Sequence, residues 1–184
     1  MWPSVTSFNR GLAVVLALVL LPVVQAATSI TLDEALALAF PDCDVERQTV
    51  YLTDDQRQRA AEVAVVDSVG GLIHTYRATK DATLVGTAYL DTHTVRTLPE
   101  TLLVVVDSAG AVSRVEVLSF REPPDYFPRA GWYDQFKGKK LDQNLAPNRG
   151  IHGITGATLT ARATTTAVRR VLAIDQILRE EAAP

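Results

Sequence analysis

The stretch HGITGATLT, residues 152–160, gathers small residues and threonine hydroxyls just ahead of an apolar-periodic segment. Gly156 and Ala157 allow another group to approach the backbone closely. A helix that begins after them presents unpaired backbone N–H groups at the same place. Such a helix N-terminus suits a phosphate. Threonines are also common helix caps, so the motif alone leaves a phosphate site and a simple cap both open.

The segments around this stretch fall into a helix and several strands. Residues 160–181 carry apolar side chains at helical spacing, which predicts the helix. Upstream, IHTYRATK and TLVGTAYLDT flank a turn at 80–82, and TLLVVVD and VSRVEVLSF flank a turn at 108–110. Short connections of this kind predict antiparallel hairpins. With the extended segment 45–52, four or five antiparallel strands are expected.

Two further helices are predicted near the beginning of the chain. Thr31 and Glu34, and then Thr53 and Gln56, have the spacing of a capping box. The first helix is expected to stop at Pro41 and the second at about residue 66. The elements together predict an α+β fold with an antiparallel β-sheet and flanking helices. We assign residues 27–71 to an N-terminal helical segment and residues 72–184 to the main domain.

The first 26 residues are predicted to be a signal peptide. Arg10 precedes the apolar run of residues 11–24, which is shorter than the ~20 residues that span a bilayer. The run ends at Val24-Gln25-Ala26, which fits the small or modest residues that a signal peptidase reads. Export to the periplasm is therefore expected, with an uncleaved membrane anchor as the alternative.

Composition argues against several classes of function. The formal net charge is −3 and no Lys/Arg block is present, so no nucleic acid partner is predicted. Cys43 is the single cysteine, which is more typical of a small buried residue than of a functional thiol. His74, His93 and His152 show no metal-ligand spacing, and no metal ligand is assigned.

Residues 152–158 resemble the D-G-x-S/T-G-A-T pattern of the FMN-binding domain. This domain occurs in the periplasmic flavin-carrying subunits of the sodium-pumping NADH:quinone oxidoreductase and of the Rnf complex, and in many small exported proteins. The matching positions are Gly153, Thr155, Gly156, Ala157 and Thr158, continued by Leu159 and Thr160. The resemblance implies that a flavin transferase esterifies Thr158 with the FMN phosphate.

The segment before this motif is also similar to the family. Glu122 and the prolines after it correspond to a Glu-Thr-Pro-Gly type segment, and WYDQFKGK at 132–139 corresponds to an aromatic helix ending in Phe-x-Gly-Lys. Tyr126, Phe127, Trp132 and Phe136 could cover the flavin ring or lie in the core. The cofactor-binding residues predicted for FMN are Gly153, Thr155, Gly156, Ala157, Thr158, Leu159, Thr160, His152, Glu122, Tyr126 and Trp132.

One position departs from the family pattern, because His152 stands where the family has aspartate. If the transferase reads that acid, FMN would be held without the ester bond. When protonated, His152 could contact the phosphate as a cation. A solvated loop histidine is the alternative.

The expected function is electron transfer by an exported flavoprotein between redox partners, with a membrane-bound donor and an association with the membrane. No G-x-G-x-x-G follows a strand, which disfavours direct use of NAD(P)H. No catalytic residue is assigned. Two alternatives stay open: an FMN-dependent reductase of a small molecule, with His152, Glu122 or Tyr126 as proton donor, and a flavin-free binding module.

Overall fold

The computed structural model describes residues 30–129 and 131–182, so the predicted signal peptide lies outside it. In chain order the elements are α1 (Leu32–Ala39), β1 (Asp44–Tyr51), α2 (Asp54–Ala64), β2 (Leu72–Lys80), β3 (Thr83–Thr94), β4 (Pro99–Asp107), β5 (Val112–Phe120), the 3-10 helices η1 (Pro124–Tyr126) and η2 (Trp132–Phe136), and α3 (Thr158–Ala182). Across these two ranges no helix is both long enough and apolar enough to cross a bilayer.

Five strands form one sheet in the order β1-β2-β3-β4-β5, and every neighbouring pair is antiparallel. The β2–β3 connection is a two-residue turn in which Asp81 and Ala82 both have positive φ, 49° and 61°. Positive φ at both central residues matches the right-handed twist of the flanking strands. The predicted α+β fold with an antiparallel sheet and flanking helices is confirmed.

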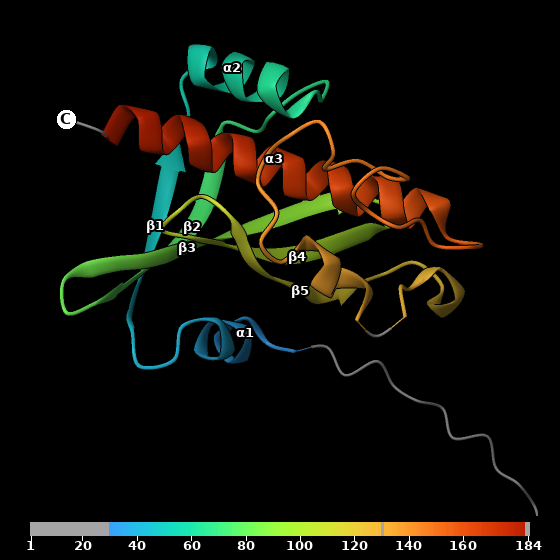
Figure 1. Cartoon of the computed structure of the whole chain (residues 1–184), viewed down its shortest axis with the longest axis horizontal. Coiled ribbons are helices and arrows are strands. Elements are labelled where there is room, and N and C mark those ends of the chain that lie inside the picture. Colours follow the sequence, from blue (N-terminus) through green and yellow to red (C-terminus); the bar gives the residue numbers. More distant parts are fainter. Residues whose placement is uncertain (1–29, 130, 183–184) are drawn as a thin grey trace, which may run out of the picture.

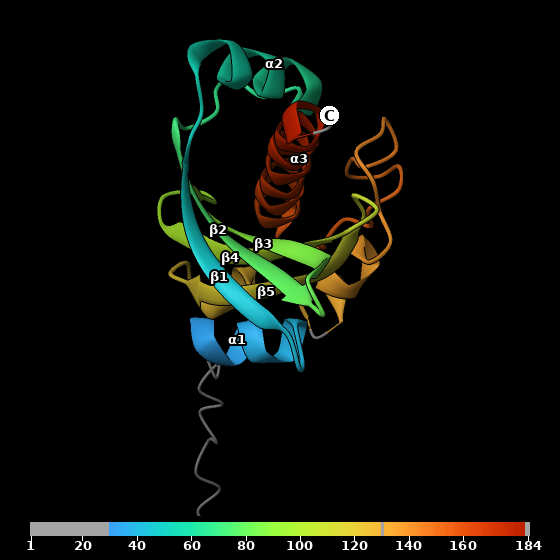
Figure 2. The ribbon, with the colours of Figure 1, turned by 90° about the vertical axis from the view of Figure 1, so that its left-hand side faces the viewer.

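The sheet is covered on both faces (Figures 1 and 2). Helix α3 lies along one face, α2 packs on α3, and α1 lies against the other face. Strand β4 therefore buries side chains in both directions. Leu102, Val104 and Val106 belong to the core under α3, whereas Leu103 and Val105 belong to the smaller core under α1. Because side chains alternate along a strand, the apolar run of β4 fits a strand buried on both faces.

Both predicted capping boxes are present. The Thr31 hydroxyl accepts from the Glu34 N–H while the Glu34 side chain accepts from the Thr31 N–H. Thr53 and Gln56 make the same pair of bonds at the start of α2. Helix α2 ends at Ala64, slightly before the expected end, because Val65 has φ 57° and leaves the helical conformation.

The N-terminal segment contributes to the sheet as well as to the helices. Strand β1 pairs with β2 along its whole length, from Asp44 opposite Thr79 to Tyr51 opposite Leu72. Helix α2 is joined to α3 by a bond from Arg169 Nε to the Ala64 carbonyl at 2.9 Å. Residues 44–71 thus belong to the same folded unit as the strands that follow them.

The long segment between β5 and α3 is anchored by a few buried apolar side chains. Phe136, Leu145 and Ile151 are each at most 1% exposed and join the core under α3. The aromatic stretch expected to be a helix forms the short 3-10 helix η2 instead. These anchors hold the rest of the segment against the start of α3, which lies at the same end of the molecule (Figure 1).

Candidate functional site

The loop before α3 combines exposed residues with a backbone conformation that favours glycine. His152, Gly153, Thr155 and Gly156 are exposed, whereas Ala157 is buried and fixes the end of the loop. Gly156 has φ 83°, in the left-handed region. A Cβ atom built on Gly156 would have no other atom within 4 Å. The backbone at Gly156 is therefore accessible to a ligand.

Helix α3 begins directly after this loop. Thr158 is its first residue and is exposed, and Leu159 is 46% exposed. Ala161 N–H donates to the Ala157 carbonyl at 3.2 Å. The backbone N–H groups earlier in the first turn have no acceptor within the helix. A helix of 25 residues also carries a partial positive charge at this end. These features favour a phosphate next to the Thr158 hydroxyl.

The 3-10 helix η2 holds the loop through the backbone of His152. The Trp132 indole Nε1–H donates to the His152 carbonyl at 2.9 Å. The His152 N–H donates to Gln135 Oε1 at 2.6 Å. The structure thus brings Trp132 and the motif together. His152 is exposed, and the bonds that it makes to η2 are main-chain bonds.

Tyr126 is tied to the first turn of α3. The Thr160 hydroxyl, which is buried, donates to the Tyr126 carbonyl at 2.9 Å. The Arg96 guanidinium lies 4.3 Å from the centre of the Tyr126 ring, a cation–π contact. Tyr126 and Arg96 therefore lie near the start of the helix that carries Thr158. Arg96 was not among the predicted site residues.

The Glu122 carboxylate is hydrogen-bonded by backbone N–H groups of the same chain. Its carboxylate oxygen Oε1 accepts from the N–H groups of Arg96, Thr97 and Leu98 at 3.0, 2.7 and 2.8 Å. The N–H groups of Thr97 and Leu98, followed by that of Arg96, hold the pKa of Glu122 below its usual value. Glu122 thereby orders the β3–β4 connection that presents Arg96. This role differs from a direct contact with FMN.

The four aromatic side chains considered for the flavin ring divide into two groups. Phe136 is fully buried and packs edge-on against Trp132 with ring centres 5.5 Å apart. Phe127 packs edge-on against Phe120 at 5.1 Å. Tyr126, Phe127 and Trp132 are partly exposed. Among these four, Tyr126, Phe127 and Trp132 can therefore offer a surface to a ligand, and Phe136 belongs to the core.

A chain of buried charged groups, missed by the sequence analysis, lies between the sheet and α3. His93 Nδ1 is 2.9 Å from Asp91 Oδ1, and His93 Nε2 is 3.0 Å from Glu100 Oε2. Since an ionised carboxylate can only accept, both ring nitrogens must donate, and His93 is an imidazolium. We call this group the buried network, and its members are His93, Asp91, Glu100, Arg170, Tyr133 and Thr164.

Both ends of the buried network reach elements that form the site. Arg170 on α3 binds Asp91 through two bonds of 2.8 Å. Tyr133 on η2 donates to Glu100 Oε1 at 2.7 Å, and Thr164 on α3 donates to Glu100 Oε2 at 2.9 Å. Within the described residues, no buried side-chain polar atom lacks a hydrogen-bond partner. Glu100 thus joins β4 to the two elements that carry Trp132 and Thr158.

The environment fixes the protonation of these groups. Burial alone would lower the pKa of His93, but the hydrogen bonds to Asp91 and Glu100 and the charges of both carboxylates raise it to about 9. Burial would raise the pKa of Asp91, but the bond from His93 and the charge of Arg170 hold it below its usual value. Burial and the neighbouring Glu100 raise the pKa of Tyr133, which keeps the phenol protonated. The charges are therefore paired at neutral pH.

Folding stability is expected to fall between about pH 6.5 and pH 9. The pKa of His93 is higher in the folded state than in the unfolded state. The charged His93 therefore contributes fully to the free energy of unfolding below the unfolded-state pKa, and this contribution is lost as the pH rises through the folded-state pKa. The difference between the pKa values of 6.5 and about 9 corresponds to a loss of at most about 3 kcal/mol in the free energy of unfolding. Urea unfolding at pH 6, 7.5 and 9 measures this loss. His93→Gln should remove most of the slope, and an equal slope in that variant would contradict the prediction.

Comparison with known proteins agrees with this geometry. Residues 98–173 match the sequence model of the FMN-binding domain. The crystal structure of Shewanella oneidensis NqrC has the same fold, with a TM-score of 0.52 and 15% sequence identity over 80% of this chain and 88% of that one. No curated protein sequence matches the chain. The matched residues include the loop, the start of α3 and most of the buried network.

The features at the start of α3 also fit this cofactor. FMN carries a phosphate, which suits the N–H groups of the helix and the open backbone at Gly156. Its flat ring requires an accessible aromatic or apolar surface, which Tyr126, Trp132 and Leu159 can supply. Residues 98–173 of this chain are therefore an FMN-binding domain.

Proposed function

We propose that this protein is an exported electron-transfer flavoprotein that carries FMN covalently as a phosphate ester of Thr158. The observation that carries the proposal is the position of Thr158. Its exposed hydroxyl stands at the first residue of α3, two residues after Gly156. When bound, FMN supplies the acceptance and release of electrons, and the protein supplies its attachment and surroundings.

The first turn of α3, Gly156 and His152 would each contribute to binding the phosphate. The N–H groups in the first turn of α3 stabilise its negative charge. Gly156 leaves room for the phosphate oxygens to approach the backbone, since no atom lies near its absent side chain. His152 is exposed beside them and adds a positive charge when protonated. An ester bond at Thr158 would keep the cofactor in place while its charge changes.

The surroundings of the ring favour transfer of electrons. Tyr126 and Trp132 offer partly exposed aromatic surfaces, and Leu98 and Leu159 are 42% and 46% exposed. The Arg96 guanidinium on Tyr126 places a fixed positive charge in this region. A positive charge stabilises the negative charge that accumulates when a bound group is reduced. The exposed apolar side chains would allow a redox partner to approach closely.

Electron transfer is favoured over turnover of a substrate by the state of Glu122. Glu122 is one of the three proton donors considered, and its carboxylate accepts hydrogen bonds from three backbone N–H groups. Tyr126 and His152 are held near the loop mainly by main-chain bonds. We propose a membrane-bound electron donor, an exported oxidoreductase as acceptor, and a flavin transferase that attaches FMN in the periplasm.

The first test is the mass of the purified protein. The full chain is expressed in a host that has a flavin transferase, purified from the periplasm and denatured in acid. We expect a chain that begins at Ala27 and is heavier by FMN less one water, with the addition on the peptide that contains Thr158. A bare mass from a yellow native sample would contradict the covalent bond. A colourless sample with the bare mass would contradict the function.

Restoring the family residue at position 152 should raise the flavin content. His152→Asp supplies the acid that the transferase reads in the family pattern, and the exposed position should tolerate the change. We expect a higher flavinylated fraction, measured from the intact mass. His152→Asn is the matched control, because it is similar in size but carries no charge. Equal fractions in both variants and the native protein would show that the transferase does not read this position.

A further inference from the structure

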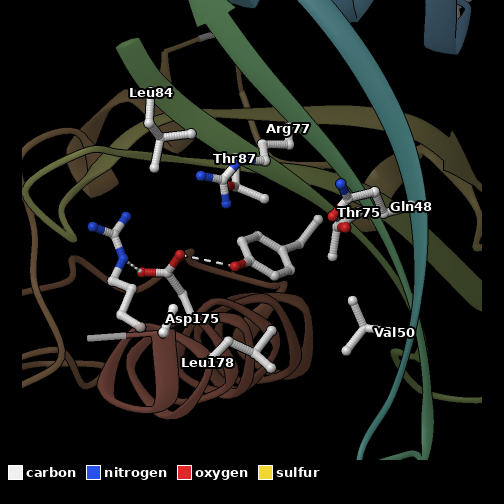
Figure 3. A pocket seen from close by; sticks show the side chains of 11 residues that line it. Gln48, Val50, Thr75, Arg77, Leu84, Thr87, Asp175 and Leu178 are labelled. Atoms are coloured by element: carbon white, nitrogen blue, oxygen red, sulfur yellow. Dashed lines mark hydrogen bonds and ion pairs between the residues drawn. The ribbon is translucent and has the colours of Figure 1, made fainter. Parts of the chain in front are cut away.

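A cavity of about 360 Å³ lies between the sheet and the C-terminal half of α3. Strands β1, β2 and β3 form one side, and the last turns of α3 form the other (Figure 3). Its helix residues, such as Asp175 and Leu178, follow Thr158 by 17 and 20 positions. At about 1.5 Å per residue this corresponds to some 25–30 Å along the helix. The cavity is therefore separate from the flavin site.

One wall of the cavity is a polar cluster whose bonds are complete. Asp175 on α3 accepts from the Tyr89 hydroxyl at 2.8 Å with one oxygen and pairs with Arg179 through the other. Arg179 also donates to the main-chain carbonyls of Asp107 and Ser108. Burial and the Asp175 charge raise the pKa of Tyr89, so it remains a hydrogen-bond donor. The negative charge of Asp175 is thus compensated and does not repel an anion.

The opposite wall presents a positive charge. Arg77 on β2 is exposed and lines the cavity beside Thr87 (Figure 3). Among residues 30–129 and 131–182, no carboxylate lies within ion-pair distance of its guanidinium. Its side chain is among those that line the cavity (Figure 3). The hydroxyl-bearing residues Thr75 and Thr87 lie on the same wall. A guanidinium with neighbouring hydroxyl groups suits a carboxylate.

Apart from Gln48 on β1, the rest of the lining is apolar. Val50 on β1, Leu84 on β3 and Leu178 on α3 are partly buried and face the cavity from three elements (Figure 3). The volume of about 360 Å³ falls at the lower end of the range for small-molecule sites. Glu46 lies opposite Arg77 in the β1–β2 register but accepts from Gln48 at 3.3 Å. A site with one cation that makes no ion pair in the described residues, and with a largely apolar lining, suits a ligand with one anionic group and a short apolar body.

We infer that this cavity binds a small organic molecule that carries a single carboxylate on an apolar body. The carboxylate contacts the Arg77 guanidinium and the hydroxyl groups beside it. The apolar body lies against Leu84, Val50 and Leu178. Tyr89, whose hydroxyl is held by Asp175, contributes the flat surface beneath the ligand. The ligand would enter from solvent and leave the flavin site unchanged.

The test is titration of the purified full protein with hexanoate and benzoate, followed by calorimetry and by NMR shifts of the Thr75 and Thr87 amides. We expect saturable binding of at least one acid and at least about tenfold weaker binding of hexan-1-ol, which lacks the charge. Arg77→Gln should weaken the acid about tenfold or more. Its thermal unfolding should match the native protein, because Arg77 is exposed.

Arg47→Gln is the matched control. Arg47 lies on β1 opposite Tyr76, whose side chain belongs to the core on the α1 side of the sheet. The control therefore removes an exposed arginine from a neighbouring strand outside the cavity lining and should bind the acid normally. The inference is overturned if neither acid binds, if hexan-1-ol binds as tightly as hexanoate, or if the two arginine variants behave alike.

Discussion

Thr158→Val is expected to abolish covalent attachment of FMN while the protein still folds. Valine has nearly the shape of threonine but lacks the hydroxyl oxygen that the ester requires. Thr158 is exposed at the start of α3, and valine and threonine have similar helix propensities. Intact mass after acid denaturation should therefore show only the bare chain. Circular dichroism and thermal unfolding should match those of the native protein.

Thr155→Val is the matched control for this prediction. Thr155 is also exposed and lies three residues earlier in the same loop, but the family pattern does not mark it as the carrier. This variant should still carry covalent FMN on Thr158, because it keeps the hydroxyl that forms the ester. Flavin that survives denaturation in Thr158→Val would refute the assignment. An equal loss in both variants would show that the loop, rather than one hydroxyl, controls attachment.

The native colour of Thr158→Val provides a second, independent measurement. The N–H groups at the start of α3 and the open backbone at Gly156 do not depend on the Thr158 hydroxyl. Non-covalent FMN should therefore still bind and give a yellow native sample that loses its colour on denaturation. The two measurements separate the ester bond from the pocket that receives the phosphate.

The strands, hairpins and helices could be predicted because their signals are local. Thr31 and Glu34 lie three residues apart, as do Thr53 and Gln56, and each pair bonds within its own helix. The two tight turns likewise depend on neighbouring residues. The sequence predicts the last helix from residue 160, just after Thr158, and the structure begins α3 two residues earlier, at Thr158 itself.

The buried network could not be predicted, because it depends on strand register and on helix packing. Asp91 and His93 are two positions apart and share one face of β3, which was the only available signal. His93 comes opposite Glu100 only in the register of the β3–β4 hairpin. Arg170 reaches Asp91 only after α3 has packed on the sheet. Without these contacts, each of the four looks like an ordinary surface charge.

The role of Glu122 could not be predicted for the same reason. Its family position suggested a contact with the cofactor, but its partners lie 24 to 26 residues earlier in the chain. The bond between Trp132 and the His152 carbonyl spans 20 residues. Neither separation is encoded by a periodic pattern. Such contacts require the path of the segment between β5 and α3, which sequence patterns leave undetermined.

Glu100→Ala is expected to cause the largest loss of stability among the single substitutions considered. Glu100 is 0% exposed and contacts His93, Tyr133 and Thr164. Alanine would leave the His93 imidazolium with one carboxylate and two buried hydroxyl groups without their acceptor. Removing one partner of a buried ion pair costs roughly 3–5 kcal/mol. Urea unfolding at pH 7 measures the loss.

Two further variants identify the physical cause of the stability loss in Glu100→Ala. Glu116→Ala removes a partly exposed acid that pairs with Arg114 on β5, and it should cost at most about 1 kcal/mol. The double variant His93→Leu/Glu100→Leu removes both charges and fills the space with apolar atoms, so it should recover much of the lost stability. A double variant as unstable as Glu100→Ala would show that shape or the hydroxyl groups of Tyr133 and Thr164, which lack an acceptor in both variants, rather than an unpaired charge, is responsible. A Glu100→Ala protein within 1 kcal/mol of the native one would contradict the stabilising role of the buried network altogether.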